Sequence, residues 1–139
     1  MSSAAEIQVV AGALFDDQHR VLIAQRPSGK HMAGGWEFPG GKLAAGETQL
    51  AALIRELHEE VGVDIREAEP LIGYSHRYAD RSVRLDLWLV TAYSGVPHSR
   101  EGQALKWVSI DELPNASLLE ADRPMIETLQ RRFGKGRAE

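Results

Sequence analysis

Residues 40–63 read GGKLAAGETQLAALIRELHEEVGV, and this segment contains the most informative spacing in the chain. From Gly41 onward the order is five residues, Glu47, seven residues, Arg55-Glu56-Leu57, one residue, Glu59-Glu60, one residue and Gly62-Val63. Nine positions are specified over 23 residues, and four of those positions are carboxylates. So many acids at defined intervals indicate a chemical role for the segment.

Residues 48–61 are predicted to form an α-helix. They contain no glycine or proline and are rich in alanine, leucine and glutamate, which favour helices. Apolar residues recur at the i, i+3, i+4, i+7 spacing of one buried stripe: Leu50, Leu53, Ile54, Leu57 and Val61. Gly46 is a turn residue before this helix and Gly62 is a stop signal after it.

Three acids of the predicted helix stand at spacings that place them on one side. Glu59 follows Glu56 by three residues and Glu60 follows it by four, so the three can lean together. Crowded carboxylates repel one another, and a hard divalent cation such as Mg²⁺ relieves the repulsion through oxygen ligands. Taken alone, such a cluster is more often a solvated helix face, so the metal interpretation depends on the preceding residues.

The residues before the helix favour a ligand site. Residues 36–38 form a short apolar run that enters the Gly40-Gly41 turn, with Lys42 directly after it. A Gly-Gly turn allows a backbone carbonyl or N–H group to approach a ligand closely. Strand, turn and acidic helix together predict a divalent metal held beside a phosphorylated substrate.

The composition is that of one ordinary domain. The chain has 139 residues, 43% hydrophobic and 26% charged, so we expect a single domain spanning residues 1–139. A net charge of -4 argues against a nucleic-acid polymer as ligand. There are no cysteines, which excludes disulfides and zinc–thiolate sites. The sequence shows no secretion signal or membrane span, so a cytoplasmic location without membrane association is expected.

Strands and helices are predicted to alternate along the chain. Strands are expected at residues 7–15, 21–24, 36–38, 71–78, 83–93 and 104–108. The apolar run at 83–93 is expected to be central. A helical turn is expected at 110–113, and a last helix starting near residue 122 or 124 carries Met125, Ile126, Leu129 and Phe133 on one face. Residues 134–139 form a polar tail expected to be disordered. This pattern predicts a mixed sheet between helices.

The segment from Gly41 to Val63 resembles the Nudix signature at every specified position. The resemblance extends from about residue 7 to about residue 133. Segments 31–33, 36–42, 101–103 and 121–126 are similar to the MutT-like branch of the family. The resemblance implies an α/β/α sandwich, dependence on Mg²⁺ with Mn²⁺ as a substitute, and attack of water on the β-phosphorus of a nucleoside triphosphate. The expected protein is a monomer or homodimer.

The resemblance also assigns roles to residues near the signature. The Gly40 carbonyl, Glu56, Glu59 and Glu60 would bind the metal, and Glu47 would support them or bind a second ion. Arg55 would orient the carboxylates, which makes the expected catalytic set Arg55, Glu56, Glu59, Glu60 and Glu101. Glu101, on a later loop, would act as general base, although alone it reads as an ordinary exposed acid. Arg26 and Lys42 would contact the phosphates.

The residues that would bind the nucleoside lie outside the signature. By position they are His31, Met32, Phe38, Tyr78, Arg81 and Asp122. Phe38 and Met32 could sandwich a base, whereas each taken singly is more typical of core packing. His31 alone is more typical of a surface loop.

Asp122 departs from the MutT pattern, in which this position is Asn. An Asn amide offers both a donor and an acceptor, which matches N7–H and O6 of 8-oxoguanine. An Asp matches both groups only if burial keeps it protonated, whereas an ionised Asp suits the amine of cytosine. Related CTP and dCTP pyrophosphatases also carry Asp here. Asp122 could instead cap the last helix.

Three functions therefore stay open. The first is hydrolysis of 8-oxo-dGTP to 8-oxo-dGMP and pyrophosphate, which sanitises the nucleotide pool and serves DNA replication and repair. The second is a CTP/dCTP pyrophosphatase. The third is a catalytically silent Nudix module that binds a nucleotide, although none of the acids of the signature is missing.

Overall fold

The computed structural model describes residues 6–27, 29 and 32–134. In chain order the elements are β1 (Ile7–Ala13), β2 (Arg20–Gln25), β3 (Trp36–Glu37), β4 (Gly40–Lys42), α1 (Gln49–Val61), β5 (Asp64–Arg77), β6 (Ser82–Ser94), β7 (Leu105–Ser109), the 3₁₀ helices η1 (Ile110–Asn115) and η2 (Glu120–Asp122), and α2 (Arg123–Phe133). The expected tail beyond Gly134 lies outside the described residues. No helix in the described ranges is long and apolar enough to cross a membrane.

The strands form two sheets. The first sheet has the order β4-β1-β6-β5. It is mixed, because β1 and β6 run parallel to each other, whereas β4 runs antiparallel to β1 and β5 runs antiparallel to β6. The second is antiparallel with the order β3-β2-β7. The sequence predicted one mixed sheet with 83–93 as a central strand, and β6 indeed lies between β1 and β5.

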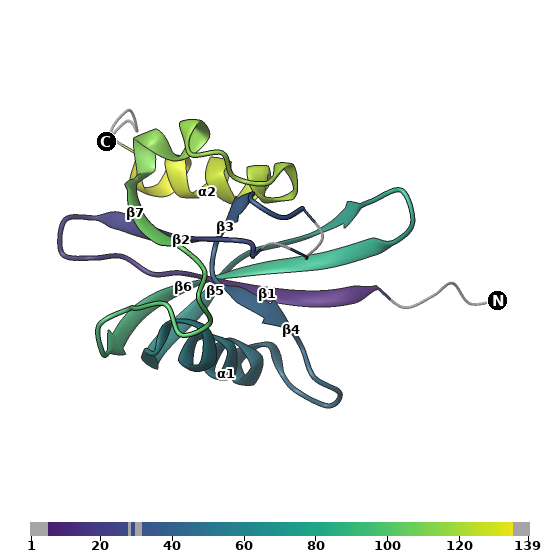
Figure 1. The fold of residues 1–139 in the computed structure, drawn as a ribbon, viewed down its shortest axis with the longest axis horizontal. Helices are drawn as coiled ribbons and strands as arrows, with labels where there is room; N and C mark the ends of the chain where they lie inside the picture. The colour runs from purple at the N-terminus through teal and green to yellow at the C-terminus, as the bar shows by residue number, and fades with distance from the viewer. Residues whose placement is uncertain (1–5, 28, 30–31, 135–139) are drawn as a thin grey trace.

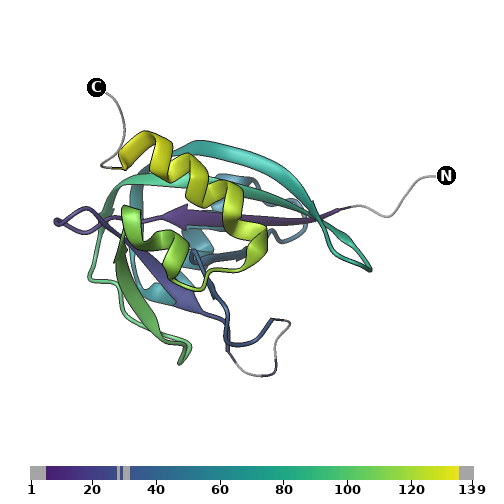
Figure 2. The same cartoon turned by 90° about the horizontal axis from the view of Figure 1, so that it is seen from above.

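The sheets lie between α1 and α2, with α1 on one side and α2 on the other (Figure 1). Side chains of β1 alternate between the two layers, as strand geometry requires. Val10, and Leu14 directly after the strand, pack in the cluster that contains α1. Ala11 and Ala13 pack in the cluster that contains α2. Seen from above, α2 crosses over the strands (Figure 2). The predicted α/β/α sandwich is confirmed.

The predicted apolar stripe of α1 is wrong at two positions. Leu50 is 38% exposed and Ile54 is 41% exposed. The buried residues are Ala52, Leu53, Leu57 and Val61. The helix is turned so that Ala52 rather than Leu50 meets the sheet, and this rotation directs the side of Glu56 and Glu60 toward β4. Phe133 of α2 is likewise 39% exposed, with its ring 5.3 Å from that of Phe15.

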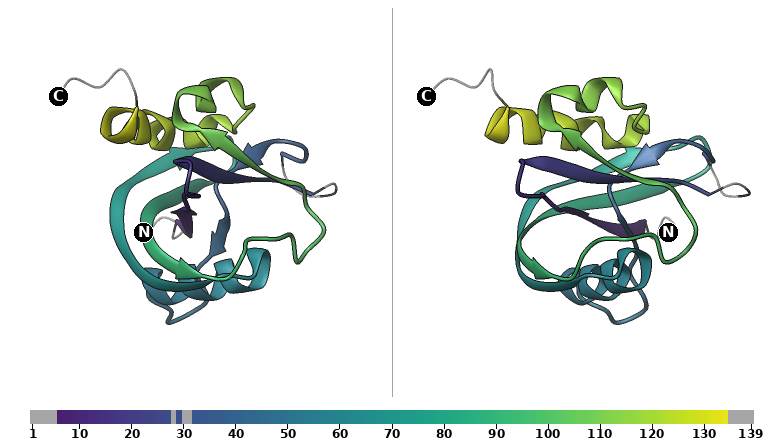
Figure 3. Two further views of the ribbon diagram at one scale, coloured as in Figure 1. Left: turned by 90° about the vertical axis from the view of Figure 1, so that its left-hand side faces the viewer. Right: turned by 60° about the vertical axis from the view of Figure 1, so that its left-hand side comes forward.

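Strands β4 and β5 differ most from the prediction. The Gly40-Gly41 segment, predicted as a turn, forms strand β4 with Lys42 and pairs with β1. Gly40 allows the close approach of the two strands, because a Cβ atom there would collide with the Val10 carbonyl. Strand β5 begins at Asp64 rather than at residue 71, and its pairing with β6 contains register shifts that interrupt the alternation of side chains. The resulting long hairpin curves along one side of the molecule from α1 toward α2 (Figure 3).

Candidate active site

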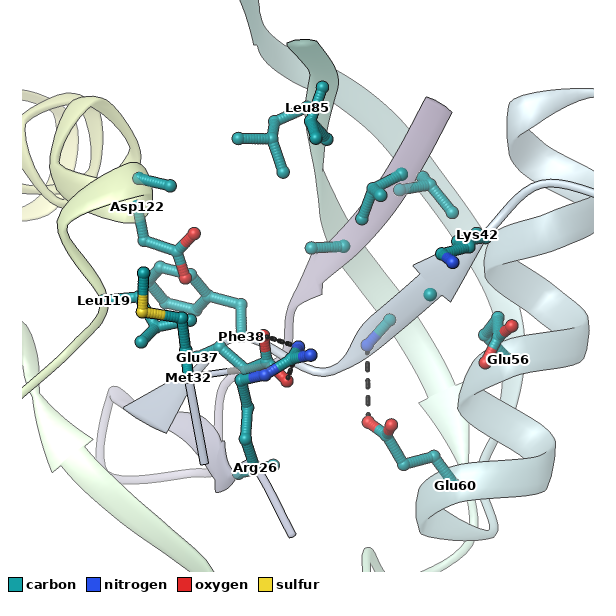
Figure 4. A pocket seen from close by; sticks show the side chains of 18 of the residues that line it. Arg26, Met32, Glu37, Phe38, Lys42, Glu56, Glu60, Leu85, Leu119 and Asp122 are labelled. Atoms are coloured by element: carbon teal, nitrogen blue, oxygen red, sulfur yellow. Dashed lines mark hydrogen bonds and ion pairs between the residues drawn. The ribbon is translucent and has the colours of Figure 1, made fainter. Parts of the chain in front are cut away.

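A cavity of about 690 Å³ connects α1 to the segment that precedes α2. Figure 4 shows its two ends, with Lys42, Glu56 and Glu60 at one and Phe38, Met32 and Asp122 at the other. Arg26 and Glu37 lie between them. The cavity therefore has an acidic end supplied by α1 and a mainly apolar end.

Helix α1 holds the acidic end in place. Thr48 caps its first turn by accepting a hydrogen bond from the Ala51 N–H at 3.1 Å, and Gly62 ends it in the left-handed conformation at φ 73°. The Gly40 N–H donates to Glu60 Oε1 at 3.3 Å. A Cβ atom on Gly41 would lie 2.5 Å from both carboxylate oxygens of Glu56, so only glycine leaves room for that carboxylate.

Arg55 links three of the four acids of the signature. Its Nε and Nη2 donate to the two carboxylate oxygens of Glu47 at 2.7 and 2.9 Å. Its Nη1 lies 3.1 Å from Glu56 Oε2 and 3.3 Å from Glu59 Oε1. The bidentate pair lowers the pKa of Glu47 to about 2. Glu56, Glu59 and Glu60 line the cavity, whereas Glu47 and Arg55 lie behind them and do not line it.

The partly buried acids Glu56 and Glu60 repel one another beside β4. Burial, followed by the nearby charges of Glu37 and Glu101, raises the pKa of Glu60 to about 8. Burial also raises the pKa of Glu56, although the Arg55 guanidinium acts in the opposite direction. Carboxylate oxygens crowded in this way suit a hard divalent cation. Within the described ranges, no group of three or more acidic or histidine side chains is already arranged to hold a metal ion, and Arg55 hydrogen-bonds both Glu56 and Glu59.

Glu101 reaches the same cavity from the loop before β7. This loop is bound to the C-terminus of α1. The N–H groups of His98 and Arg100 donate to the carbonyls of Val61 and Glu60 at 3.0 and 3.1 Å. The Arg100 guanidinium also donates to the His58 carbonyl at 3.2 Å. The loop thus satisfies carbonyls that a helix end leaves open, and it places Glu101 near the acids of the same helix.

The apolar end contains most of the residues expected to bind a nucleoside. Phe38 is 3% exposed and Met32 is 49% exposed, and both line the cavity with Tyr78 and Arg81. The Arg81 guanidinium lies 5.7 Å from the centre of the Tyr78 ring. Its Nε is buried without a hydrogen-bond partner among the described residues, so an acceptor on a bound molecule would satisfy it. His31 lies outside the described residues.

Asp122 is a buried acid at the apolar end, with 6% of its surface exposed. Burial, followed by the charge of Glu37, raises its pKa to about 7, while the Phe38 N–H and Arg26 act in the opposite direction. Asp122 occupies the N-cap position of α2, but its side chain makes no capping hydrogen bond. The capping interpretation is therefore wrong, and the carboxyl group faces the cavity instead.

The sequence interpretation missed Glu37. Its two carboxylate oxygens accept hydrogen bonds from Arg26 Nη1 at 3.1 and 3.2 Å. A phosphate group would therefore share Arg26 with Glu37. Its charge contributes to the raised pKa values of both Glu60 and Asp122. Gln103, Leu119 and Met125 were also missed, and they line the cavity. Only alternation along 36–38 could have hinted at Glu37, since such a short strand gives little periodic signal.

A comparison with known families supports the signature. The NUDIX domain family matches residues 10–128. The chain belongs to the Nudix family. This confirms the relationship expected from residues 41–63, and the match includes both ends of the cavity.

Individual Nudix relatives are similar over nearly the whole chain. The 8-oxo-dGTP diphosphatase of Escherichia coli is 34% identical over 126 residues, which cover 91% of this chain and 98% of that protein. The CTP pyrophosphohydrolase of the same organism is 38% identical over 121 residues, with coverage of 87% and 89%. A solved MutT structure, from work on Aliivibrio salmonicida and Vibrio cholerae, is 39% identical, covers 93% of this chain and all of its own, and superposes with a TM-score of 0.81. Nudix hydrolases generally need a divalent metal ion, and the acidic end of this cavity offers the oxygen donors that such an ion takes.

Proposed function

We propose that this Nudix protein is a Mg²⁺-dependent pyrophosphohydrolase that converts 8-oxo-dGTP to 8-oxo-dGMP and pyrophosphate. The observation that carries the base assignment is Asp122, which is buried at the apolar end with a pKa raised to about 7. One relative, which is 34% identical over 91% of the chain, is an 8-oxo-dGTP diphosphatase. The activity would remove an oxidised nucleotide from the pool used in DNA replication.

The acidic end supports the phosphate chemistry. Glu56, Glu59, Glu60 and the Gly40 carbonyl would hold Mg²⁺ or Mn²⁺, and Arg55 would keep the carboxylates aligned. The bound ion supplies Lewis acidity to the phosphate oxygens. Glu47 supports this set by holding Arg55 through two hydrogen bonds. This role fits Glu47 better than direct metal ligation, because Glu47 does not line the cavity.

Glu101 is suited to receive the proton of the attacking water. It lies on the cavity wall, and its charge acts on Glu60. The water oxygen bonds to the β-phosphorus. The bond between this phosphorus and the oxygen that bridges it to the α-phosphorus breaks, and the nucleoside monophosphate leaves with that oxygen. Lys42 and Arg26 would bind the phosphates. Arg26 also pairs with the Glu37 carboxylate at 3.1 Å, and this negative charge partly offsets the attraction of Arg26 for phosphate.

A protonated Asp122 can match 8-oxoguanine. Its hydroxyl donates to O6 while its carbonyl accepts from N7–H, as an Asn amide would. Normal guanine has no hydrogen on N7, so the second bond is lost with dGTP. A site built around buried polar groups rejects an analogue that leaves one of them unpaired. Phe38 and Met32 supply apolar surface for the ring.

A CTP or dCTP pyrophosphatase is the second candidate. It is favoured by the acid at position 122 and by the CTP pyrophosphohydrolase that is 38% identical over 87% of the chain. The ionised form of Asp122 would accept from the exocyclic amine of cytosine. At neutral pH both forms of this carboxyl group are populated, since its pKa is about 7.

Steady-state kcat/KM for 8-oxo-dGTP, dGTP, dCTP and CTP with Mg²⁺ separates these functions. The proposal expects 8-oxo-dGTP to exceed dGTP by about two orders of magnitude or more and to exceed dCTP. Equal rates for 8-oxo-dGTP and dGTP, or a clear preference for dCTP, would contradict it. No turnover of any of the four would indicate a nucleotide-binding module without catalysis.

A further inference from the structure

The peptide group between Ala121 and Asp122 is hydrogen-bonded at both of its polar atoms. The Tyr74 hydroxyl donates to the Ala121 carbonyl at 2.6 Å. On the other side of the same peptide, the Asp122 N–H donates to the Leu119 carbonyl at 3.0 Å. A peptide unit is planar, so two bonds in opposite directions fix the orientation of the plane from which Asp122 departs.

The backbone of Asp122 does not have α-helical geometry. Its dihedral angles are φ -90° and ψ 1°, in the sparsely populated bridge region where many active-site residues lie. The side chain forms no capping bond that would hold it to α2. The direction of the carboxyl group therefore depends on the orientation of the preceding peptide, together with the hydrogen bond that the carboxyl group accepts from the Phe38 N–H.

The segment before Asp122 is attached to both sheets. On one side, the Leu119 N–H donates to the Trp36 carbonyl of β3 at 2.9 Å. On the other side, Tyr74 reaches it from β5, which belongs to the four-stranded sheet. The Tyr74 ring is half-buried and packs against the core cluster that contains Ala121. Tyr74 does not line the cavity, whereas Tyr78, which directly follows β5, does.

We propose that Tyr74 is a positioning residue for base selection, acting through the Ala121 carbonyl on the direction of the Asp122 carboxyl group. The inference rests on the proposed function, in which Asp122 contacts the base. Tyr74 touches neither base nor phosphate and acts only by orienting the peptide. Loss of its hydroxyl leaves the Ala121 carbonyl without this donor, and the peptide can then rotate toward another partner.

Such a rotation affects one end of the cavity only. The acids of α1 are held by Arg55 and by the Gly40 N–H, and none of these contacts involves residues 119–122. Tyr74→Phe should therefore weaken discrimination between bases while leaving the phosphate chemistry in place. A purely structural role would instead lower all activities together.

The chain offers a matched control. Tyr93 also donates from its hydroxyl to a backbone carbonyl, that of Phe15, at 3.0 Å, and it is partly buried like Tyr74. Tyr93 does not line the cavity, and neither does Phe15. Tyr93→Phe thus removes the same chemical group and the same kind of bond from a place unrelated to Asp122.

The test measures two kinds of ratio in the wild type and both variants. One is kcat/KM for 8-oxo-dGTP relative to dGTP and to dCTP. The other is the Kd of 8-oxo-dGMP relative to dGMP and dCMP by titration calorimetry, which does not require turnover. Since one hydrogen bond is worth a few-fold in an equilibrium, Tyr74→Phe should shrink the wild-type preference by about five-fold or more. Its kcat on the best substrate should stay within about three-fold of that of Tyr93→Phe. Thermal unfolding shows whether both variants are folded.

The outcomes separate the two proposals. A wild type that prefers dCTP contradicts the 8-oxo-dGTP function, and a smaller dCTP preference in Tyr74→Phe still supports the positioning role. A wild type that prefers 8-oxo-dGTP, with an unchanged preference in a folded Tyr74→Phe protein, overturns the positioning role alone. An equal loss of preference in Tyr74→Phe and Tyr93→Phe also overturns it. A wild type with no preference among the bases overturns both.

Discussion

Gly41 packs against the carboxyl group of Glu56, and a Cβ atom on Gly41 would lie 2.5 Å from each carboxylate oxygen of Glu56. Strand β4 and helix α1 are therefore packed so closely that the carboxylate occupies the space of a missing side chain. The neighbouring Gly40 faces backbone instead, since its Cβ would collide with the carbonyl of Val10 on β1.

Substituting these two glycines should have different consequences. Gly41→Ala displaces only the end of a flexible side chain, so we expect a folded protein with kcat lowered by about ten-fold or more and a higher Mg²⁺ requirement. Gly40→Ala should instead lower the Tm sharply, because the obstruction is backbone of β1. Mg²⁺ titrations of activity and thermal unfolding check both. A fully active Gly41→Ala enzyme would count against Glu56 as a metal ligand.

Glu59→Gln should abolish most metal-dependent turnover while the fold stays intact. The Glu59 side chain is 51% exposed, so little packing is lost, but the site loses a negative oxygen donor. We expect kcat to fall by about two orders of magnitude or more. Far-ultraviolet circular dichroism and Tm verify folding. Glu127→Gln, an exposed acid on α2, is the control. Activity that survives Glu59→Gln shows that the ligand assignment is wrong.

Asp122→Asn should change how stability depends on pH. The folded-state pKa of Asp122 is raised from 3.8 to about 7, so between these values the folded protein holds a proton that the unfolded chain has released. The stability of the wild type therefore decreases as pH rises from about 4 to about 7 and is level above that. The Asn variant lacks this contribution. Its free energy of unfolding relative to that of the wild type should rise by on the order of 2–3 kcal/mol between pH 5 and pH 8.

Urea unfolding of both proteins without metal at pH 5, 6, 7 and 8 checks this difference. The same substitution also tests the base assignment. Wild-type selectivity for 8-oxo-dGTP over dCTP should decline as pH passes about 7, whereas the Asn variant should show no such decline and should retain or gain activity on 8-oxo-dGTP. A pH-independent ratio in the wild type would falsify protonated Asp122 as the group that reads the base.

Arg100→Ala should slow catalysis by loosening the loop that carries Glu101. The guanidinium binds the His58 carbonyl at 3.2 Å, and we expect kcat to fall by roughly three- to ten-fold with little change in KM. In a Glu101→Gln background the same substitution should have almost no further effect. If Arg100→Ala reduces kcat by the same factor in both backgrounds, Arg100 does not act through Glu101.

Two leucines of α1 should differ widely in their contribution to stability. Leu57 is fully buried and Leu50 is 38% exposed. We expect Leu57→Ala to lower the free energy of unfolding by about 2–4 kcal/mol, and Leu50→Ala to change it by only ~0.5 kcal/mol. Denaturant unfolding measures both. Similar losses for the two variants would restore the apolar stripe predicted from the sequence.

The acidic end could be predicted from the sequence because its parts are local. Glu56, Glu59 and Glu60 stand at helical spacing, and Gly62 ends the helix where the pattern says it should. The helix boundaries and the approach of a glycine-rich strand follow from short-range rules of propensity and capping. The rotation of α1 about its axis could not be predicted from these rules. Whether Leu50 or Ala52 packs against the sheet is decided only once β1 and β4 are in place.

The apolar end depends on contacts between residues far apart in the chain. Tyr74 meets Ala121 across 47 positions, and Glu37 acts on both Glu60 and Asp122. The sequence determined the family, the fold class and the helical spacing of the acids that we propose as metal ligands, since these arise from spacing within one helix and its flanking turns. Only the tertiary structure decided that Asp122 is buried and shifted toward neutrality, because burial and charge coupling arise when separate strands close around the same space.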